Sequence, residues 1–544
     1  MKNFQQPEPF NAGRAAIRFY GRKSMAETAI ELKNVTKRFG DVVANDHINL
    51  TLKHGEILAL LGENGSGKTT LMNMLAGIYF PDEGEIFVNG HEVTIRSPKE
   101  SHALGLGMIH QHFKLIDVLT AAQNIVLGMD GPVKMDMKAL TKDIRHVCER
   151  DGFELDLDKK IYEMSVSEKQ TTEIVKALYR GADILILDEP TAVLTPQETE
   201  KLFSALRKMK DNGKSIIIIT HKLNEVMEIS DQVTVLRKGK FAGTINTIDA
   251  DEQTLAEMMV GDKVDLNIER TEVSAPEDKV EVRGITVRNN EGLKTLDNVS
   301  FTAHTGEILG IAGTSGSGQR ELLEAIAGLQ EVESGEIFYK APDGTVEDLT
   351  KKTPAQIQDL KISLSFVPED RLGMGLVGNM DLTGNMMLRS YKEGKGIFTD
   401  RKKPRELAEK IVDRLEVVTP SVDTPVRNLS GGNVQKVLVG REIASSPQVL
   451  MVAYPVRGLD INSSYSIYNL LGEEKKKGVA VICVGEDLDV LIQLCDRILV
   501  LSEGTVTGIV DARNTTKDEL GLLMAKGRKD HSRRKKQESE EAVS

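Results

Sequence analysis

The chain has 544 residues, of which 40% are hydrophobic and 28% charged, and its formal net charge at pH 7 is −12. This length and composition are typical of a protein with large apolar cores in more than one domain. The acidic balance argues against a nucleic-acid partner, and no run of about 18 apolar residues is present, so we predict no membrane-spanning helix.

The sequence contains two related halves. The segment HGEILALLGENGSGKTTLMNMLAG at 54–77 returns as TGEILGIAGTSGSGQRELLEAIAG at 305–328. Two later blocks, EMSVSEKQ and ILILDEPTAVLT, return in the same order as NLSGGNVQ and VLMVAYPVRGLD. A repeat this long indicates two homologous domains and not a solenoid.

We therefore predict five segments along the chain. The first 24 residues lack the apolar core of a secretory signal, and we interpret them as an extension because Met25 with AETAIELKNVTKRFG resembles a natural start. The tail is dense in charge and is expected to be disordered. In order, the segments are an N-terminal extension (1–25), a first domain (26–262), a polar linker (263–279), a second domain (280–527) and a disordered tail (528–544).

Short apolar runs alternate with amphipathic helical stretches in each half. In the first half these runs are ILALLG (57–62), DILILDE (183–189) and SIIIITH (215–221). Continuous aliphatic runs of this length are typical of buried parallel strands. Because helical patterns lie between them, we predict an α/β fold in each half.

A complete phosphate-binding pattern, G-x-x-x-x-G-K-[ST], follows the first of these strands. Its glycines allow backbone N–H groups to turn toward phosphate oxygens, and the following helix adds its positive N-terminus. We expect Lys68 to reach the β- and γ-phosphates and the Thr69 hydroxyl to ligate Mg²⁺. The predicted loop comprises Gly62, Glu63, Asn64, Gly65, Ser66, Gly67, Lys68, Thr69 and Thr70.

Two acids and a histidine follow the other two strands. We assign Asp188 to the metal ion and Glu189 to the general base, because a strand-end carboxylate pair can bind Mg²⁺ and deprotonate water. His221 ends the third run, and we interpret it as a sensor that hydrogen-bonds the γ-phosphate.

These motifs, with LSGGN at 429–433, resemble those of ATP-binding-cassette (ABC) ATPases over nearly the whole chain. The resemblance implies two tandem P-loop ABC ATPase domains, each a RecA-like α/β core with an antiparallel β subdomain and a helical subdomain. It also implies that Gln111 joins the Mg²⁺ site to a permease contact and takes part in catalysis. Phe39, in KRFG, matches the aromatic residue that stacks on adenine.

The second half departs from the family's pattern at its own nucleotide site. The second half has Gln319 in place of Lys68, Arg320 in place of Thr69, Ala453 in place of Asp188 and Tyr454 in place of Glu189. It also has Glu486 in place of His221, Glu369 in place of Gln111 and Asn290 in place of Phe39. The first half is defective elsewhere: MSVSE stands where the LSGGQ signature is expected, and Ser167 replaces a glycine that approaches the γ-phosphate. The D-loop residue is Thr195 in the first half and Asp460 in the second.

Family members pair their cassettes head to tail, so that each nucleotide lies between one Walker set and the other signature. Under that arrangement one composite site is intact and the other combines both defects. The intact site adds Ser430, Gly431, Gly432, Asn433 and Asp460 to the first Walker set. We therefore hypothesise one hydrolytic site per chain, which uses ATP and Mg²⁺.

Two fused cassettes without a membrane segment resemble the ATP-binding subunit of bacterial simple-sugar and nucleoside importers. The blocks at 109–128 and 367–391 are most similar to the nucleoside branch. The resemblance implies two integral-membrane permease subunits, an extracellular substrate-binding lipoprotein reached through them, and a place on the cytoplasmic face of the plasma membrane. The permease contact is expected after Gln111, at Phe113 and Leu115.

Three other functions stay open at this point. One is a simple-sugar importer ATPase. Another is a soluble twin-cassette factor that associates with ribosomes, although such factors typically keep two good Walker sets and a long charged linker. The third is a DNA-repair cassette ATPase, whose zinc modules or coiled-coil insertion this sequence lacks.

Overall fold

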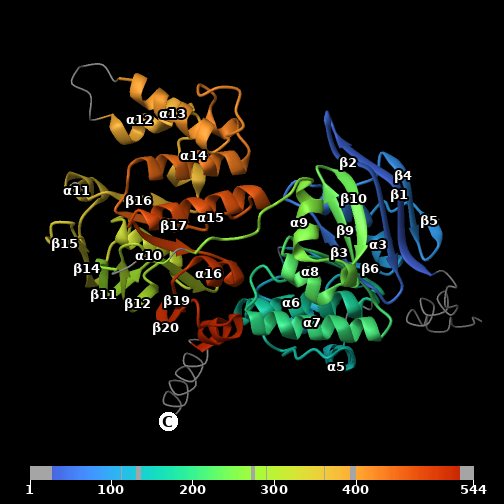
Figure 1. The fold of residues 1–544 in the computed structure, drawn as a ribbon. Helices are drawn as coiled ribbons and strands as arrows, with labels where there is room; N and C mark the ends of the chain where they lie inside the picture. Colours follow the sequence, from blue (N-terminus) through green and yellow to red (C-terminus); the bar gives the residue numbers. More distant parts are fainter. Residues whose placement is uncertain are drawn as a thin grey trace, which may run out of the picture. The chain divides into compact units, whose positions relative to one another are not determined.

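The structure is a computed structural model that describes residues 27–111, 113–129, 136–270, 272, 276–289, 291–360, 362–391 and 400–526. The predicted extension at 1–25, the predicted tail at 528–544 and Asn290 lie outside these residues. Two compact units divide the chain: the described residues up to Pro190 with Ser204–Met259, and Thr191–Phe203 with the described residues from Val260 onward. Figure 1 shows the elements of both. We call the elements before residue 261 the first half and those after residue 277 the second half.

The first half contains the three strands that its aliphatic runs predict, together with other strands and helices whose bounds were not predicted. Its strands are β1 (Thr28–Phe39), β2 (Val42–Lys53), β3 (Ile57–Leu61), β4 (Glu83–Val88), β5 (His91–Val93), β6 (Leu106–Ile109), β7 (Ile184–Asp188), β8 (Ser215–Ile219), β9 (Gln232–Arg237) and β10 (Lys240–Asn246). Its helices are α2 (Lys68–Leu75), α3 (Pro98–Ala103), α4 (Ala121–Val126), α5 (Met137–Asp151), α6 (Val166–Tyr179), α7 (Pro196–Asp211), α8 (Leu223–Ile229) and α9 (Glu252–Val260), with short 3-10 turns η2 (Ile161–Glu163) and η3 (Thr247–Asp249).

The strands of the first half form a sheet in the order β5-β4-β1-β2-β10-β9-β3-β8-β7-β6. The five consecutive strands β9, β3, β8, β7 and β6 pair in parallel, whereas β1, β2, β4 and β5 pair antiparallel. Every residue of β3, β7 and β8 is buried, as continuous aliphatic runs require when helices cover both faces of a sheet. The predicted RecA-like core and antiparallel β subdomain are thus both present.

The second half repeats these elements. Its strands are β11 (Asp278–Arg288), β12 (Lys294–His304), β13 (Ile308–Gly313), β14 (Ser334–Lys340), β15 (Val346–Asp348), β16 (Leu364–Val367), β17 (Val449–Ala453), β18 (Ala480–Val484), β19 (Arg497–Ser502) and β20 (Thr505–Asp511). Its helices are α10 (Gln319–Ile326), α11 (Pro354–Asp359), α12 (Leu382–Ser390), α13 (Lys402–Arg414), α14 (Gly431–Ala444), α15 (Ile461–Lys476) and α16 (Leu488–Leu494), with the π turn η4 (Arg371–Gly375) and the 3-10 turn η5 (Val426–Asn428). Strand β11 begins two residues before the predicted domain start at 280.

Two sheets stand in the second half where the first half has one. They have the orders β12-β11-β14-β15 and β16-β17-β18-β13-β19-β20. The difference is small, because a single pair, Lys240 with Asp46, joins the antiparallel and parallel parts in the first half. The backbone hydrogen bond beside that pair, from Asp46 N to Gly239 O (2.7 Å), has an equivalent from Asp297 N to Gly504 O (2.9 Å).

Each half also has a helical subdomain with its own apolar packing. In the first half α4, α5 and α6 enclose a cluster that includes Ile125, Ile144 and Val175. In the second half α12 and α13 lie side by side next to α14, as Figure 1 shows. Among the described residues, no helix combines the length and apolarity that a membrane crossing requires.

A half-buried aspartate fixes the start of the central strand β13 in the second half. One Asp496 carboxylate oxygen accepts the Ile308 backbone N–H at 2.8 Å, and the other accepts Lys475 Nζ at 2.6 Å. The Lys475 side chain is only 2% exposed, so Asp496 takes the place of water as the partner of its ammonium group.

The first half holds β3 in the same way but nearer to solvent. Asp231 accepts Ile57 N at 2.9 Å and Lys210 Nζ at 2.5 Å, and the Lys210 side chain is 32% exposed. An equivalent aspartate therefore anchors the strand that leads into each phosphate loop. Its lysine partner is accessible to water in the first half and buried in the second.

We predict that Asp496→Ala destabilises the second half by about 3 kcal/mol, because it leaves the Lys475 ammonium buried without its carboxylate. The matched change Asp231→Ala should cost the first half only about 1 kcal/mol, since water can solvate Lys210. Hydrogen–deuterium exchange of the β3 and β13 amides across a urea series measures both values. Equal losses in the two halves would contradict this account of the buried lysine.

Candidate functional site

The phosphate loop of the first half lies between β3 and α2. Gly67 is the N-cap of α2 and has φ 96°, in the left-handed region, and no side chain caps the helix. A Cβ on Gly67 would lie 2.5 Å from the Ala44 carbonyl oxygen, so only glycine fits. The first-turn N–H groups of α2 are therefore not capped by a side chain, which is the arrangement that binds a phosphate.

The polar side chains of this loop have few protein acceptors. Lys68 is buried, and its Nζ donates to the carbonyls of Gly62 (2.6 Å) and Glu63 (2.9 Å). Burial lowers the Lys68 pKa, and Glu189, Asp188 and Glu63 oppose that shift. The Ser66 hydroxyl is buried and has no hydrogen-bond partner among the described residues. An ammonium, an orphaned hydroxyl and an uncapped helix together fit a phosphate chain.

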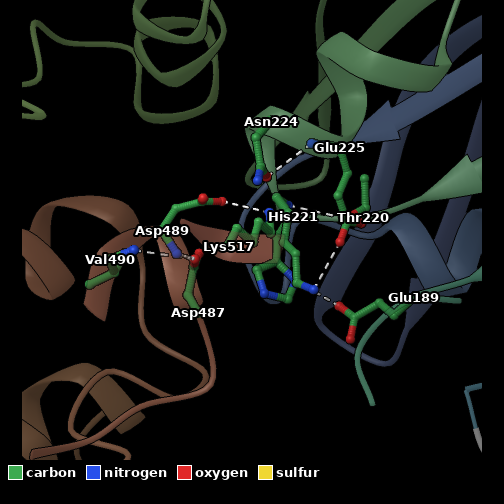
Figure 2. Close-up of polar contacts among 10 residues, drawn as sticks. Glu189, Thr220, His221, Asn224, Glu225, Asp487, Asp489, Val490 and Lys517 are labelled. Atoms are coloured by element: carbon green, nitrogen blue, oxygen red, sulfur yellow. Dashed lines mark hydrogen bonds and ion pairs between the residues drawn. The ribbon is translucent and has the colours of Figure 1, made fainter. Parts of the chain in front are cut away.

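The predicted catalytic residues meet at the edge of the sheet next to this loop. Gln111 follows β6, Glu189 follows β7 and His221 follows β8. Gln111 Nε2 donates to Glu189 Oε2 at 2.9 Å, and His221 Nδ1 lies 3.0 Å from Glu189 Oε1. Figure 2 shows the histidine ring directed at the Glu189 carboxylate. The structure thus brings together all three residues that the sequence nominated.

The pKa values of the two neighbouring carboxylates, Asp188 and Glu189, shift in opposite directions. The His221 hydrogen bond lowers the Glu189 pKa. Burial and the neighbouring Glu189 raise the Asp188 pKa to about 6, although Lys68 opposes this. Glu189 has φ 47°, so the chain bends sharply after β7 and aims this side chain away from the strand. An ionised Glu189 with both oxygens hydrogen-bonded has the charge and orientation that a general base needs.

Two polar side chains hold the turn that carries His221. Thr220 Oγ1 donates to Glu225 Oε2 at 3.4 Å and accepts the Lys222 backbone N–H at 3.1 Å (Figure 2). Both Thr220 and Glu225 are buried. The sequence analysis did not identify these supporting residues, because neither belongs to a motif.

Asn45 is a third supporting residue that was not predicted from the sequence. Its buried side chain donates from Nδ2 to the Gly67 carbonyl at 3.2 Å, directly beneath the phosphate loop. Its counterpart in the second half is Leu296. A comparison of the two halves could have identified Asn45, because the second half lacks the equivalents of both Asn45 and Lys68.

Phe39 lies at the end of β1 with a half-exposed ring. The ring packs edge-on to Tyr79, with centroids 5.2 Å apart, and Lys37 Nζ lies 5.5 Å from its centre. An exposed, laterally supported ring is suited to stacking on a base. The adenine contact stays a prediction.

The second half keeps the backbone of this site but not its chemistry. Gln319 begins α10, and its Nε2 donates to the Thr314 carbonyl at 3.1 Å, as Lys68 does to Glu63, but without charge. Arg320 pairs with Glu324 at 2.6 Å. Tyr454 has φ 48°, the same bend as at Glu189, and burial raises its pKa to about 12, so the phenol stays neutral.

The two signature turns differ in the charge at their helix N-termini. Ser165 caps α6 in a capping box with Glu168, whose carboxylate accepts Ser165 N at 2.7 Å and pairs with Lys159. In the second half Ser430 caps α14 with uncharged Asn433, whose Nδ2 donates to Ser430 Oγ at 2.9 Å. A carboxylate thus already neutralises the α6 terminus, whereas the α14 terminus remains favourable for an anion.

The D-loop residue Asp460 lies beside the second signature turn. It is the N-cap of α15, and its carboxylate accepts Ser463 N at 2.7 Å and Ser463 Oγ at 2.8 Å. A Cβ built on Gly432 would lie 3.4 Å from Asp460 Oδ2. The structure therefore places Gly432 and Asp460 close together in the second half, and their shared role in a nucleotide site stays a prediction.

Comparisons with known proteins agree with this geometry. Residues 45–192 and 296–455 match the family described as "ABC transporter". The nucleoside import ATP-binding protein NupA of Lactococcus lactis is 42% identical over 92% of this chain and 99% of its own. The guanosine import ATP-binding protein NupO of Bacillus subtilis is 42% identical over 92% and 98%, and the glucose import ATP-binding protein TsgD13 of Haloferax volcanii 40% over 92% and 96%.

One solved structure matches both halves at once. It is the complex of archaeal ribosomal stalk protein aP1 with the ribosome recycling factor aABCE1, at a TM-score of 0.56 over 91% of this chain and 92% of that one. The sequence identity is 18%, so the likeness concerns the fold alone.

We predict that Glu189→Gln lowers ATP hydrolysis by about 10²–10⁴-fold, because the amide cannot accept a proton, and leaves ATP binding intact. Steady-state phosphate release and equilibrium ATP binding by the full chain measure the two effects. Glu228→Gln, at a half-exposed surface glutamate paired with Arg207, is the matched control. Wild-type turnover in Glu189→Gln would show that the second half hydrolyses ATP.

Proposed function

The chain belongs to the ABC transporter family and is an ATP-binding ATPase of that family, and from this premise we propose that it drives a nucleoside importer. The observation that carries the proposal is the Glu189 carboxylate, held by Gln111 and His221 next to a complete phosphate loop. The equivalent positions of the second half hold Glu369, Tyr454 and Glu486. Hydrolysis is therefore assigned to one site per chain.

The first half supplies the catalytic side of that site. Lys68 and the N–H groups of the loop bind the phosphates of ATP, and Glu189 removes a proton from the attacking water. Thr69, Gln111 and Asp188 are the residues that would hold Mg²⁺, which neutralises phosphate charge when it is bound. Asp188 is the buried strand-end carboxylate that this role requires.

The second half supplies the signature. In the proposed head-to-tail pairing, Ser430, Gly431, Gly432, Asn433 and Asp460 complete the site that the first Walker set begins. The argument from charge supports this choice, because the α14 terminus carries no acid in its first turn whereas α6 carries Glu168.

Exposed apolar side chains follow the Gln111 position in both halves and support a pair of permease contacts. In the first half Ile116 and Val118 are exposed, while the predicted contact residue Leu115 packs partly against the helical-subdomain core. In the second half Leu372 and Met374 are exposed at the equivalent place. Exposed apolar groups clustered in one region of a fold are typical of an interface.

The permease would hold the chain at the cytoplasmic face of the membrane, with a substrate-binding lipoprotein on the other side. We propose nucleosides as cargo because the names of NupA and NupO refer to nucleoside and guanosine import. A simple sugar is the second candidate, which the glucose-import name of TsgD13 favours.

Deletion of the gene should abolish uptake of labelled nucleosides and leave uptake of labelled ribose and glucose unchanged. Wild type should restore uptake, and Glu189→Gln should not, because import needs hydrolysis. Immunoblots that show equal amounts of the two proteins are the control. Loss of sugar uptake in place of nucleoside uptake would overturn the cargo, and unchanged uptake of all three would overturn the importer.

A further inference from the structure

An arginine occupies the centre of the degenerate site in the second half. Arg457 lies three residues beyond Tyr454 and forms ion pairs with Glu369 through Nη1 and with Glu486 through Nε, the latter at 3.0 Å. Its guanidinium lies 5.7 Å from the centre of the Tyr454 ring. The two acids are the counterparts of Gln111 and His221, so a fixed cation joins the loops that follow β16, β17 and β18.

A second arginine connects this cluster to the signature turn. Arg371 follows Glu369 by two residues, and its guanidinium donates from Nη2 to the Arg457 carbonyl and from Nη1 to the Gly431 carbonyl at 3.4 Å. Gly431 is the first residue of α14. The chain of contacts therefore runs from Glu486 through Arg457 and Arg371 to the signature.

The two arginines have different partners within this cluster. Arg457 pairs with both glutamates, whereas Arg371 donates to the backbone carbonyls of Arg457 and Gly431. A planar guanidinium can bridge several acceptors at fixed angles, which a lysine ammonium cannot do. The cluster is thus suited to fixing the relative positions of the loops that it joins.

The first half has no such arginines. The counterparts of Arg371 and Arg457 are Phe113 and Ala192. There Gln111, Glu189 and His221 contact one another beside the phosphate loop. The arginines thus occur in the half that has lost its catalytic residues and kept its signature.

We propose that Arg457 and Arg371 are positioning residues, which hold the signature turn of the second half in place for the working site without a nucleotide of their own. We refer to them with Glu369 and Glu486 as the arginine brace. The inference rests on the proposed function, since the signature matters only if it pairs with the first Walker set.

The test uses the full chain with the substitutions Arg371→Ala, Arg457→Ala and Arg457→Lys. The control is Arg405→Ala, which removes an arginine–aspartate pair with Asp423 on the exposed surface of the helical subdomain. Three quantities are measured for each: the ATP concentration for half-maximal hydrolysis, the affinity for ADP, and the thermal unfolding midpoint. ADP lacks the γ-phosphate that a signature contacts, so it reports on the first Walker set alone.

We expect Arg371→Ala and Arg457→Ala to raise the half-saturating ATP concentration about tenfold, which corresponds to about 1.4 kcal/mol. ADP affinity should stay at the wild-type value. Arg457→Lys should recover part of the loss, because an ammonium can still pair with one glutamate. The control should match wild type in all three quantities.

If the alanine variants fold, two outcomes overturn the brace. One is hydrolysis by Arg371→Ala and Arg457→Ala indistinguishable from that of the control. The other is a parallel fall in ADP affinity and unfolding midpoint, which would mean that the arginines only stabilise the fold. If an alanine variant does not fold, Arg457→Lys with unchanged half-saturation overturns it as well. A wild-type chain without ATP hydrolysis would instead overturn the proposed function on which the brace rests.

Discussion

The convergence of strand ends at one edge of a parallel sheet is the constraint on which both halves depend. Strands β3, β8, β7 and β6 lie in that order, and each ends in a loop that carries one part of the site. The phosphate loop, His221, Glu189 and Gln111 follow them respectively. Because parallel strands place their carboxyl ends together, residues far apart in the chain reach one carboxylate. The second half has the same order in β13, β18, β17 and β16.

The backbone of this edge persists where the chemistry has changed. Gly67 and Gly318 have φ values of 96° and 98°, and Glu189 and Tyr454 have 47° and 48°. Asp231 and Asp496 make the same hydrogen bond to the first residue of the central strand. The fold thus requires the bends and anchors but not these side chains, so the second half is well packed although it has no equivalent of Lys68, Glu189 or His221.

Much of the first site could be predicted because its residues belong to local patterns. The glycines and lysine of the phosphate loop are contiguous, and Glu189 and His221 each end an aliphatic strand. The family was likewise predicted and is confirmed by the match of both halves. The individual roles of these residues and the domain boundaries stay predictions.

Contacts between distant side chains could not be predicted in this way. Arg457 and Glu369 are 88 residues apart, and neither stands in a motif that points to the other. The capping box of α6 is a different case: Ser165-x-x-Glu168 is a local helix-start pattern, but this segment was interpreted only as a damaged signature. A sequence pattern can therefore have an alternative structural role that becomes clear only when its hydrogen bonds are known.

Electrostatics explains why the losses in the two halves go together. An acid in the first turn of α6 disfavours a phosphate there, and the glutamates at 369 and 486 disfavour one at the second Walker edge. In the proposed head-to-tail arrangement both sets of acids would belong to the same composite site. The carboxylates already serve internal pairing, with Lys159 in one half and Arg457 in the other. Under that proposal, the charges that disfavour a phosphate chain are the same charges that hold the surrounding loops together.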